Sequence, residues 1–273
     1  MDAPKEWTAV DAAAWVRAPM SDDDKYRRGV LGVVTGSSRY PGAAVLGVEA
    51  AVRTGVGMVR YLGEATGQVL ARRPEAVTVP GRVQAWLLGS GMDAASRTPA
   101  LAAQLAEVLA EGLPTVLDAG ALVLAPATTG LAILTPHARE LAVLFEATGV
   151  TPVPDDPAAR AAHAAEAYGA AVLLKGAVTH IAAPGGAAYT VTAPTHWLAT
   201  AGTGDVLGGI LGAVLATNHD RLGEPAALAA IAATAAYLHG HAALAASAAA
   251  GGGPVPALRI AKAVAPEVGR LLG

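Results

Sequence analysis

The residues best suited to chemistry lie in the run 200–210, Thr-Ala-Gly-Thr-Gly-Asp-Val-Leu-Gly-Gly-Ile. Residues 202–204 form a loop without bulky side chains, ahead of an apolar helix predicted over 206–216. Free backbone N–H groups and the helix dipole would converge there on an anion, above all a phosphoryl group in transfer. Asp205 is predicted to be a general base that takes a proton from an attacking hydroxyl. The alternative is that Asp205 only caps the helix and the glycines make a tight turn.

Further candidate groups follow predicted strands. In parallel α/β sheets, ligands bind beyond the carboxyl ends of the strands, so groups at those ends predict one shared site. Taken singly, each is consistent with an ordinary turn. Neither the Gly-x-Gly-x-x-Gly fingerprint nor a Walker-type Gly-Lys-Ser/Thr occurs, which disfavours those two nucleotide-binding classes. The candidate groups at strand ends are, besides the glycine loop, Gly36-Ser37, Gly89-Ser90-Gly91, Asp118, His137 and Lys175-Gly176.

Two of these strand-end groups, at Lys175 and at His137, have side chains that could contact a ligand. Lys175 ends an apolar run, so its ammonium would emerge at the sheet edge and meet a nucleotide phosphate, with Thr179 adding a hydroxyl. The alternative is a solvated lysine in a turn. His137 would donate to an amide or phosphate, and Glu140, one helical turn later, would reach a metal through water. Their alternative roles are a structural histidine and a favourable acidic residue in the first helical turn.

The elements that position these groups alternate along the chain. This alternation predicts an α/β fold, a mainly parallel central sheet with helices on both faces, in one domain over 1–273. Strands are predicted over 30–35, 57–62, 76–79, 85–88, 115–117, 131–134 and 171–174, with a hairpin of 178–183 and 187–191. Helices are predicted over 43–54, 99–109, 139–146, 158–168, 206–216, 225–246 and 257–272.

Composition excludes several function classes. Net charge is −3 without a basic block, which argues against a nucleic-acid partner. The absence of cysteine excludes disulfides, thiolate catalysis and Cys-ligated metals, and fits a cytoplasmic protein. No Asp/Glu/His cluster has the spacing of a protein metal cage, so Mg²⁺ would be held largely by phosphates and water. The uncharged stretch 225–256 is mostly alanine and predicts a buried helix, with no membrane partner.

In collinear order from about residue 30 to residue 216, the chain resembles the ADP-dependent NAD(P)H-hydrate dehydratases, which have the ribokinase-like three-layer fold. The Gly-Thr-Gly-Asp segment is shared with other ribokinase-like enzymes, whereas Tyr-Pro-Gly-Ala-Ala and Thr-Pro-His make the match specific. The matching motifs are Gly36-Ser37, Tyr40-Pro41-Gly42-Ala43-Ala44, residues 51–57 (Ala-Val-Arg-Thr-Gly-Val-Gly), residues 135–140 (Thr-Pro-His-Ala-Arg-Glu), Leu174-Lys175-Gly176 and residues 199–207 (Ala-Thr-Ala-Gly-Thr-Gly-Asp-Val-Leu).

The resemblance implies a repair reaction. The hydroxyl of hydrated NADH or NADPH is phosphorylated by ADP, with Mg²⁺, and phosphate is then eliminated to leave AMP and the restored dinucleotide. Asp205 would be the base. The remaining assignments implied by the family are Ala43, Gly91, His137 and Asp205 for the hydrated dinucleotide, Lys175, Gly176, Ala177, Val178, Thr179 and Gly204 for the adenine nucleotide, and the backbone N–H groups of Ala201, Gly202, Thr203 and Gly204 as an anion hole.

The resemblance also implies a homo-oligomer such as a tetramer, and a separate NAD(P)H-hydrate epimerase chain, because many relatives carry a fused epimerase domain. Three positions depart from the family pattern: Thr200 stands for Asn, Arg139 for Gly, and Ser90 for Pro. Two rival functions remain. One is a ribokinase-like kinase for a small alcohol such as a hydroxymethylpyrimidine or thiazole. The other is a non-catalytic nucleotide sensor, which the presence of Asp205 argues against.

Overall fold

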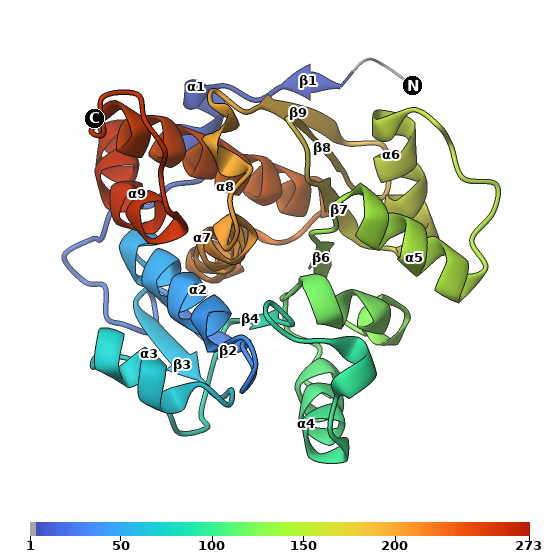
Figure 1. Cartoon of the computed structure of the whole chain (residues 1–273), viewed down its shortest axis with the longest axis horizontal. Helices are drawn as coiled ribbons and strands as arrows, with labels where there is room; N and C mark the ends of the chain where they lie inside the picture. The colour runs from blue at the N-terminus through green and yellow to red at the C-terminus, as the bar shows by residue number, and fades with distance from the viewer. Residues whose placement is uncertain (1–3) are drawn as a thin grey trace.

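A nine-stranded sheet forms the centre of the computed structural model, which describes residues 4–273 (Figure 1). The strand order is β1-β9-β8-β7-β6-β5-β4-β2-β3, and the pairs are parallel except β7–β8 and β8–β9. The strands are β1 (Lys5–Glu6), β2 (Val30–Val34), β3 (Met58–Tyr61), β4 (Ala85–Leu88), β5 (Thr115–Leu117), β6 (Ala132–Leu134), β7 (Ala171–Leu174), β8 (Val178–Ala182) and β9 (Ala188–Thr192).

Helices cover both faces of the sheet, and two separate apolar cores result. One core lies under α2 (Pro41–Thr54), α7 (Thr203–Thr217), α8 (Pro225–Ala248) and α9 (Ala257–Leu272), with α1 (Ala9–Ala13) and α3 (Thr66–Arg72) at its margins. The other lies under α4 (Pro99–Ala110), the 3-10 helix η2 (Ala119–Ala127), α5 (Ala138–Thr148) and α6 (Pro157–Tyr168). The predicted α/β class, with a mainly parallel sheet between helical layers, is confirmed.

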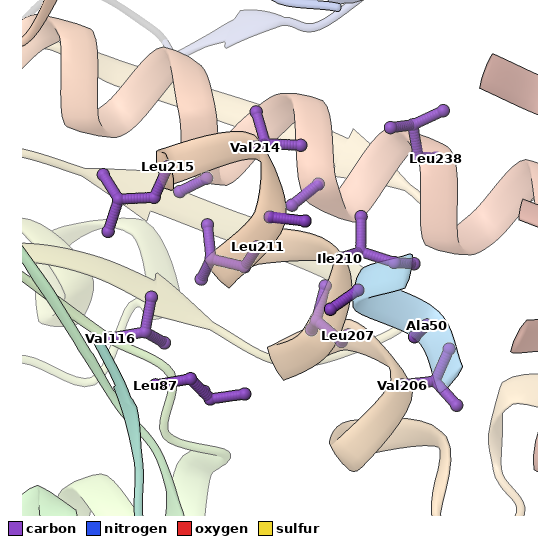
Figure 2. Close-up of a cluster of buried hydrophobic side chains, with 14 of the residues drawn as sticks. Ala50, Leu87, Val116, Val206, Leu207, Ile210, Leu211, Val214, Leu215 and Leu238 are labelled. Carbon is purple, nitrogen blue, oxygen red and sulfur yellow. The ribbon is translucent and has the colours of Figure 1, made fainter. Parts of the chain in front are cut away.

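Helix α7 is the centre of the larger core. Its apolar side chains point in several directions, toward Leu87 and Val116 of the sheet, Leu238 of α8 and Ala50 of α2 (Figure 2). A helix that is apolar on all sides is expected to be buried. In α7, residues 206–217 are all buried. This packing fixes the position of the α7 N-terminus, where the glycine loop ends.

The carboxyl ends of four parallel strands, β2, β4, β5 and β6, are aligned. Val34 pairs with Leu88, Leu88 with Leu117, and Leu117 with Leu134. Beyond the ends of β6 and β7, His137 and Lys175 form a further parallel bridge. The groups that follow these strands therefore lie along one edge of the sheet, as the sequence predicts.

Two predicted elements differ from the structure. The predicted strand 76–79 contributes only a single bridge, Val77 to Arg60, because Pro74 and Pro80 enclose it and its end is exposed. The helix predicted over 206–216 begins at Thr203 instead, so Gly204 and Asp205 belong to its first turn. The sequence also gave no prediction for β1, α1, α3 or η2.

Helix α8 is long and apolar enough to cross a membrane by length and composition, but 83% of its most apolar window is buried within the protein. Its residues pack against α7, α9 and the strands β7, β8 and β9. The predicted buried helix is therefore confirmed.

Candidate active site

A buried carboxylate, Asp118, links the ends of three strands. It follows β5, is 4% exposed, and accepts hydrogen bonds from Ser90 Oγ at 2.8 Å and Thr135 Oγ1 at 2.7 Å. Lys175 Nζ, at the end of β7, lies 3.0 Å from Asp118 Oδ1. A buried charge is tolerated only when it is paired and hydrogen-bonded, so this network fixes the position of the lysine ammonium.

The ammonium of Lys175 also lies 3.6 Å from Glu140 Oε2. Burial lowers the pKa of Lys175, but the carboxylates of Asp118 and Glu140 outweigh it, and the net pKa is raised above its usual value. The amine is therefore protonated at neutral pH. With a side chain 21% exposed, it retains a face that a bound phosphate can reach.

His137 and Glu140 begin α5 with a reciprocal cap. The N–H of Glu140 donates to His137 Nδ1 at 3.1 Å, and the N–H of His137 donates to Glu140 Oε2 at 2.8 Å. The structure therefore shows His137 as a structural histidine that caps the helix, and Glu140 as an acidic residue in its first turn. Because Nδ1 is an acceptor here, a neutral His137 carries its proton on Nε2, which is available to donate to a ligand.

The glycine loop ends in an uncapped helix N-terminus. Gly202 is the N-cap residue, with a left-handed φ of +87°, and it supplies no side-chain cap. A Cβ at Gly202 would lie 2.6 Å from Leu46 Cδ1 and 3.2 Å from Ala257 of α9, so the loop rests closely on α2 and α9. Within residues 4–273, the N–H groups of Gly204 and Asp205 have no backbone acceptor, which leaves them directed at an incoming anion.

Thr203 holds this loop in shape. Its hydroxyl donates to the carbonyl of Leu198 at 2.8 Å, and lies 3.0 Å from the carbonyl of Thr200. Gly204 brings the loop close to the lysine, because a Cβ at Gly204 would lie 3.8 Å from Lys175 Nζ. The helix N-terminus and the ammonium therefore converge on one space, and both favour negative charge there.

Asp205, in the first turn of α7, has a pKa raised from 3.8 to about 6. Burial is the main cause and the nearby carboxylate of Asp118 adds to it, whereas Lys175 opposes it. A carboxylate with a pKa near 6 is mostly ionised at neutral pH, yet is a better proton acceptor than an exposed aspartate. This geometry suits the predicted base.

Most residues predicted to hold the adenine nucleotide line one cavity of about 520 Å³. Lys175, Thr203 and Gly204 line it, together with apolar side chains that include Ala193, Leu198 and Leu207. The volume is in the range of small-molecule sites. Of the set predicted for the adenine nucleotide, Gly176, Ala177 and Thr179 also line it and Val178 does not. Of the predicted anion hole, Ala201 and Gly202 lie outside the cavity wall.

Ala43 and Gly91 are packed against each other, away from that cavity. A Cβ at Gly91 would lie only 2.4 Å from Ala43 Cβ, and Ser37 Oγ donates to the Gly91 carbonyl at 2.9 Å. The next residue, Met92, lines a second cavity of about 420 Å³. His137 lines both cavities, so it forms part of a shared wall.

Replacing Gly91 with alanine is expected to lower both stability and turnover. Its φ is +67°, a left-handed conformation that is unfavourable by about 1–2 kcal/mol for a residue with a Cβ. The added methyl group must also displace Ala43, and a displacement of about 1 Å at a site costs roughly 10²-fold in rate. Thermal unfolding and steady-state kinetics of Gly91→Ala measure both effects.

Gly185→Ala is the matched control, because Gly185 has a φ of +85° but no atom within 4 Å of its Cβ position. It should show the backbone effect on Tm and leave turnover unchanged. Equal kinetics for the two variants would remove Gly91 from the site.

The three departures from the family pattern have local explanations. Thr200 Oγ1 donates to the carbonyl of Trp197 at 2.9 Å, inside the loop. Ser90 donates to Asp118 and so supports the buried carboxylate. Arg139 is exposed and leaves the His137–Glu140 cap intact.

Two residues lie at central positions of the site that the sequence does not indicate. Asp118 was one of several strand-end groups, and its contacts to residues 28, 17 and 57 positions away have no local signal. His239 on α8 lines the 520 Å³ cavity, although it lies in a stretch for which the sequence predicts only an alanine-rich buried helix. No group of three or more His, Cys, Asp or Glu residues within 4–273 is placed to hold a metal.

A family model described as NAD(P)H-hydrate dehydratase matches residues 31–266. A bifunctional NAD(P)H-hydrate repair enzyme of Mycobacterium leprae is 45% identical over 260 residues, covering 91% of this chain and 52% of that protein. The chain thus spans about half the length of the curated relatives of this bifunctional kind that it matches.

A relative of more similar length is the ADP-dependent (S)-NAD(P)H-hydrate dehydratase of Neisseria meningitidis, 37% identical over 83% of this chain and 80% of its own. The crystal structure of the ADP/ATP-dependent NAD(P)H-hydrate dehydratase of Bacillus subtilis, grown with ATP and Mg²⁺, superposes with a TM-score of 0.83 at 25% identity. That match covers 99% of this chain and 100% of the other. The layers and topology are those of the ribokinase-like fold.

Proposed function

Because the chain belongs to the NAD(P)H-hydrate dehydratase family, we propose that it converts (6S)-NAD(P)H hydrate to NAD(P)H at the expense of ADP, yielding AMP and phosphate. The observation that carries the proposal is Asp205, with its raised pKa, in the first turn of a helix whose free N–H groups face Lys175. Each of these groups has a role in the proposed reaction.

The first step is phosphoryl transfer to the hydroxyl of the hydrated nicotinamide. Asp205 accepts the hydroxyl proton as that oxygen bonds to the terminal phosphorus of ADP, and the bond from that phosphorus to the bridging oxygen of AMP breaks. Negative charge on the transferred group is met by the N–H groups of the α7 N-terminus and by the ammonium of Lys175. Such preorganised donors need no rearrangement as charge develops.

The second step is elimination. Hydroxide is a poor leaving group, whereas phosphate leaves readily. Loss of phosphate together with one ring proton restores the ring double bond, so no oxidant or reductant is consumed. The two cavities that share His137 support the binding of two substrates side by side, with the adenine nucleotide in the 520 Å³ cavity beside Lys175. We place the hydrated dinucleotide against Ala43 and Gly91.

Mg²⁺ is part of the proposal as an ion carried by the nucleotide. The site offers the carboxylates of Asp205, Asp118 and Glu140. Asp118 already accepts from Ser90, Thr135 and Lys175, and Glu140 accepts from the N–H of its own helix cap. That donor set fits an ion held mainly by phosphate oxygens and water. Bound there, it would neutralise phosphate charge.

The test mixes the purified protein with Mg²⁺ and hydrated NADH, adds ADP or ATP in parallel, and follows the return of the dihydronicotinamide absorbance. Recovery with ADP is the expected result. Recovery with ATP alone would keep the reaction and reverse the choice of donor. If folded protein gives no recovery with either donor, the favoured function becomes phosphorylation of a small alcohol, which needs the same base and anion site but stops at the phosphate ester.

We further propose a single-domain protein over 1–273 that acts in the cytoplasm as a homo-oligomer, alongside an epimerase of the same repair route. The inclusion of every strand in one sheet supports the single domain. The bifunctional name of the M. leprae relative supports coupling to a second activity. Sedimentation velocity tests the oligomer.

A further inference from the structure

A third cavity, of about 160 Å³, borders the proposed position of the hydrated dinucleotide. It shares Met92 and Asp93 with the 420 Å³ cavity. Ser37, which also lines it, donates to the carbonyl of Gly91 at 2.9 Å. Sites that enclose a whole small ligand usually have about 300–1,000 Å³, so this smaller cavity suits one group of a longer molecule that extends past Met92.

Arg97 gives this cavity a cation without an anionic partner. Its Nη2 atom donates to the carbonyl of Gly120 at 2.6 Å, which holds the guanidinium in place. Its Nη1 atom has no hydrogen-bond acceptor among residues 4–273 and, unlike Nε, is not sealed from solvent. No aspartate or glutamate in the described part of the chain forms an ion pair with Arg97.

Burial makes this lack of a partner costly. Half-burial lowers the pKa of Arg97, yet a guanidinium remains protonated at any ordinary pH. A cation that is partly removed from water is stabilised by a counter-ion, and here the chain supplies none. The side chain therefore favours a bound anion in the 160 Å³ cavity.

Other groups on the cavity wall also suit a phosphate. Arg39 adds a second guanidinium, and Thr98 is the N-cap of α4, so the positive end of that helix dipole lies at the wall. Two carboxylates, those of Asp93 and Glu64, line the cavity as well. Each accepts a backbone N–H at 3.0 Å, and neither is paired with Arg97.

We propose that Arg97 binds a phosphate group of the hydrated dinucleotide in the cavity beyond Met92. The inference rests on the proposed binding of that substrate against Ala43 and Gly91. A dinucleotide carries a central diphosphate, and NADPH carries a further phosphate on its adenosine ribose. Either group offers oxygens that accept from Nη1 and charge that pairs with the guanidinium. Arg97 thereby contributes to affinity for the dinucleotide and not for ADP, which lies beside Lys175.

The experiment measures Kd for NADPH, NADH and ADP by isothermal titration calorimetry, because the two reduced dinucleotides keep every phosphate of their hydrates. Arg97→Met keeps an apolar stem and removes the guanidinium. We expect its Kd for NADPH to rise about tenfold, the effect of one hydrogen bond to a charged group, with Kd for ADP unchanged. An equal rise for NADH identifies the diphosphate as the bound group, whereas an unchanged Kd for NADH identifies the ribose phosphate of NADPH.

Arg259→Met is the matched control, because Arg259 is an exposed arginine on α9 that lines none of the three cavities. It should leave all three affinities unchanged, and Arg97→Lys, which keeps the charge, should retain part of the NADPH affinity. Equal weakening of ADP and NADPH in Arg97→Met would indicate distortion around Gly120 and overturn the proposal. Unchanged affinity for both dinucleotides, or a wild-type protein that binds neither, would overturn it as well. A selective loss of dinucleotide affinity in a protein without dehydratase activity would overturn the proposed reaction alone.

Discussion

Asp205→Asn is expected to lower kcat by roughly 10²- to 10⁴-fold, the usual cost of removing a general base. The amide keeps the size and most of the polarity of the carboxylate but cannot accept the hydroxyl proton. Substrate binding should change little, since Lys175 and the α7 N-terminus remain in place. Steady-state kinetics with hydrated NADH and ADP measure kcat and KM separately.

The same substitution should make the protein more stable at neutral pH. The pKa of Asp205 is about 6 in the folded protein and 3.8 in an ordinary aspartate, so the folded state disfavours the ionised form. This destabilisation begins above pH 3.8 and is complete above pH 6. Asp205→Asn should thus raise the free energy of unfolding by about 2 kcal/mol at pH 8, and by almost nothing at pH 3.5.

The pH dependence of turnover follows from the same value. Wild-type kcat should fall as the pH drops through about 6, because protonated Asp205 cannot act as a base. Asp155→Asn, at an exposed aspartate in the loop before α6, is the control and should match wild type in rate and stability. An Asp205→Asn protein that keeps wild-type kcat, or one that loses activity by unfolding, would contradict the assignment.

Lys175→Met is expected to weaken ADP binding roughly 10- to 100-fold, because a hydrogen bond to a charged group contributes about 1.5–3 kcal/mol. It should also destabilise the fold by leaving Asp118 without its partner. About 2–3 kcal/mol is expected, less than for a fully buried pair because the Lys175 side chain is 21% exposed. Calorimetric titration with ADP and chemical denaturation give the two values.

A double variant separates these two effects. Lys175→Met with Asp118→Asn removes both charges, and should recover much of the lost stability without recovering ADP affinity. Loss of the lysine alone should also raise the pKa of Asp205, because the charge of Lys175 lowers that pKa. The fall in kcat at acidic pH should therefore begin at a higher pH. Lys262→Met, at an exposed lysine on α9, is the control for a lost surface charge. ADP affinity that is equal in Lys175→Met and Lys262→Met would rule out the phosphate role of Lys175.

The sequence was most informative where local pattern decides structure. Short apolar runs ended by glycine or a polar group located the strands with aligned ends, because a buried parallel strand needs apolar side chains on both faces. The start of α7 was placed three residues late, since Gly202 and Gly204 have low helix propensity. A helix N-terminus accepts such residues, because its first N–H groups make no helical bond in any case.

The groups around Asp118 and His239 could not be placed from the sequence. Ser90, Thr135 and Lys175 reach Asp118 only because β4, β5, β6 and β7 are neighbours, which is a property of strand order. Helix α8 is buried on most sides and rich in alanine, so periodicity does not indicate which side of it faces a cavity.

The close packing of Gly202 against Ala257 has a consequence for synthesis of the chain. The glycine loop is supported from behind by α9, a helix that follows it in sequence only after α7 and α8. On the ribosome, the loop therefore emerges well before the helix that supports it. The loop's own hydrogen bonds from Thr203 can form early, but its contact with Ala257 forms only when α9 has been made and has docked.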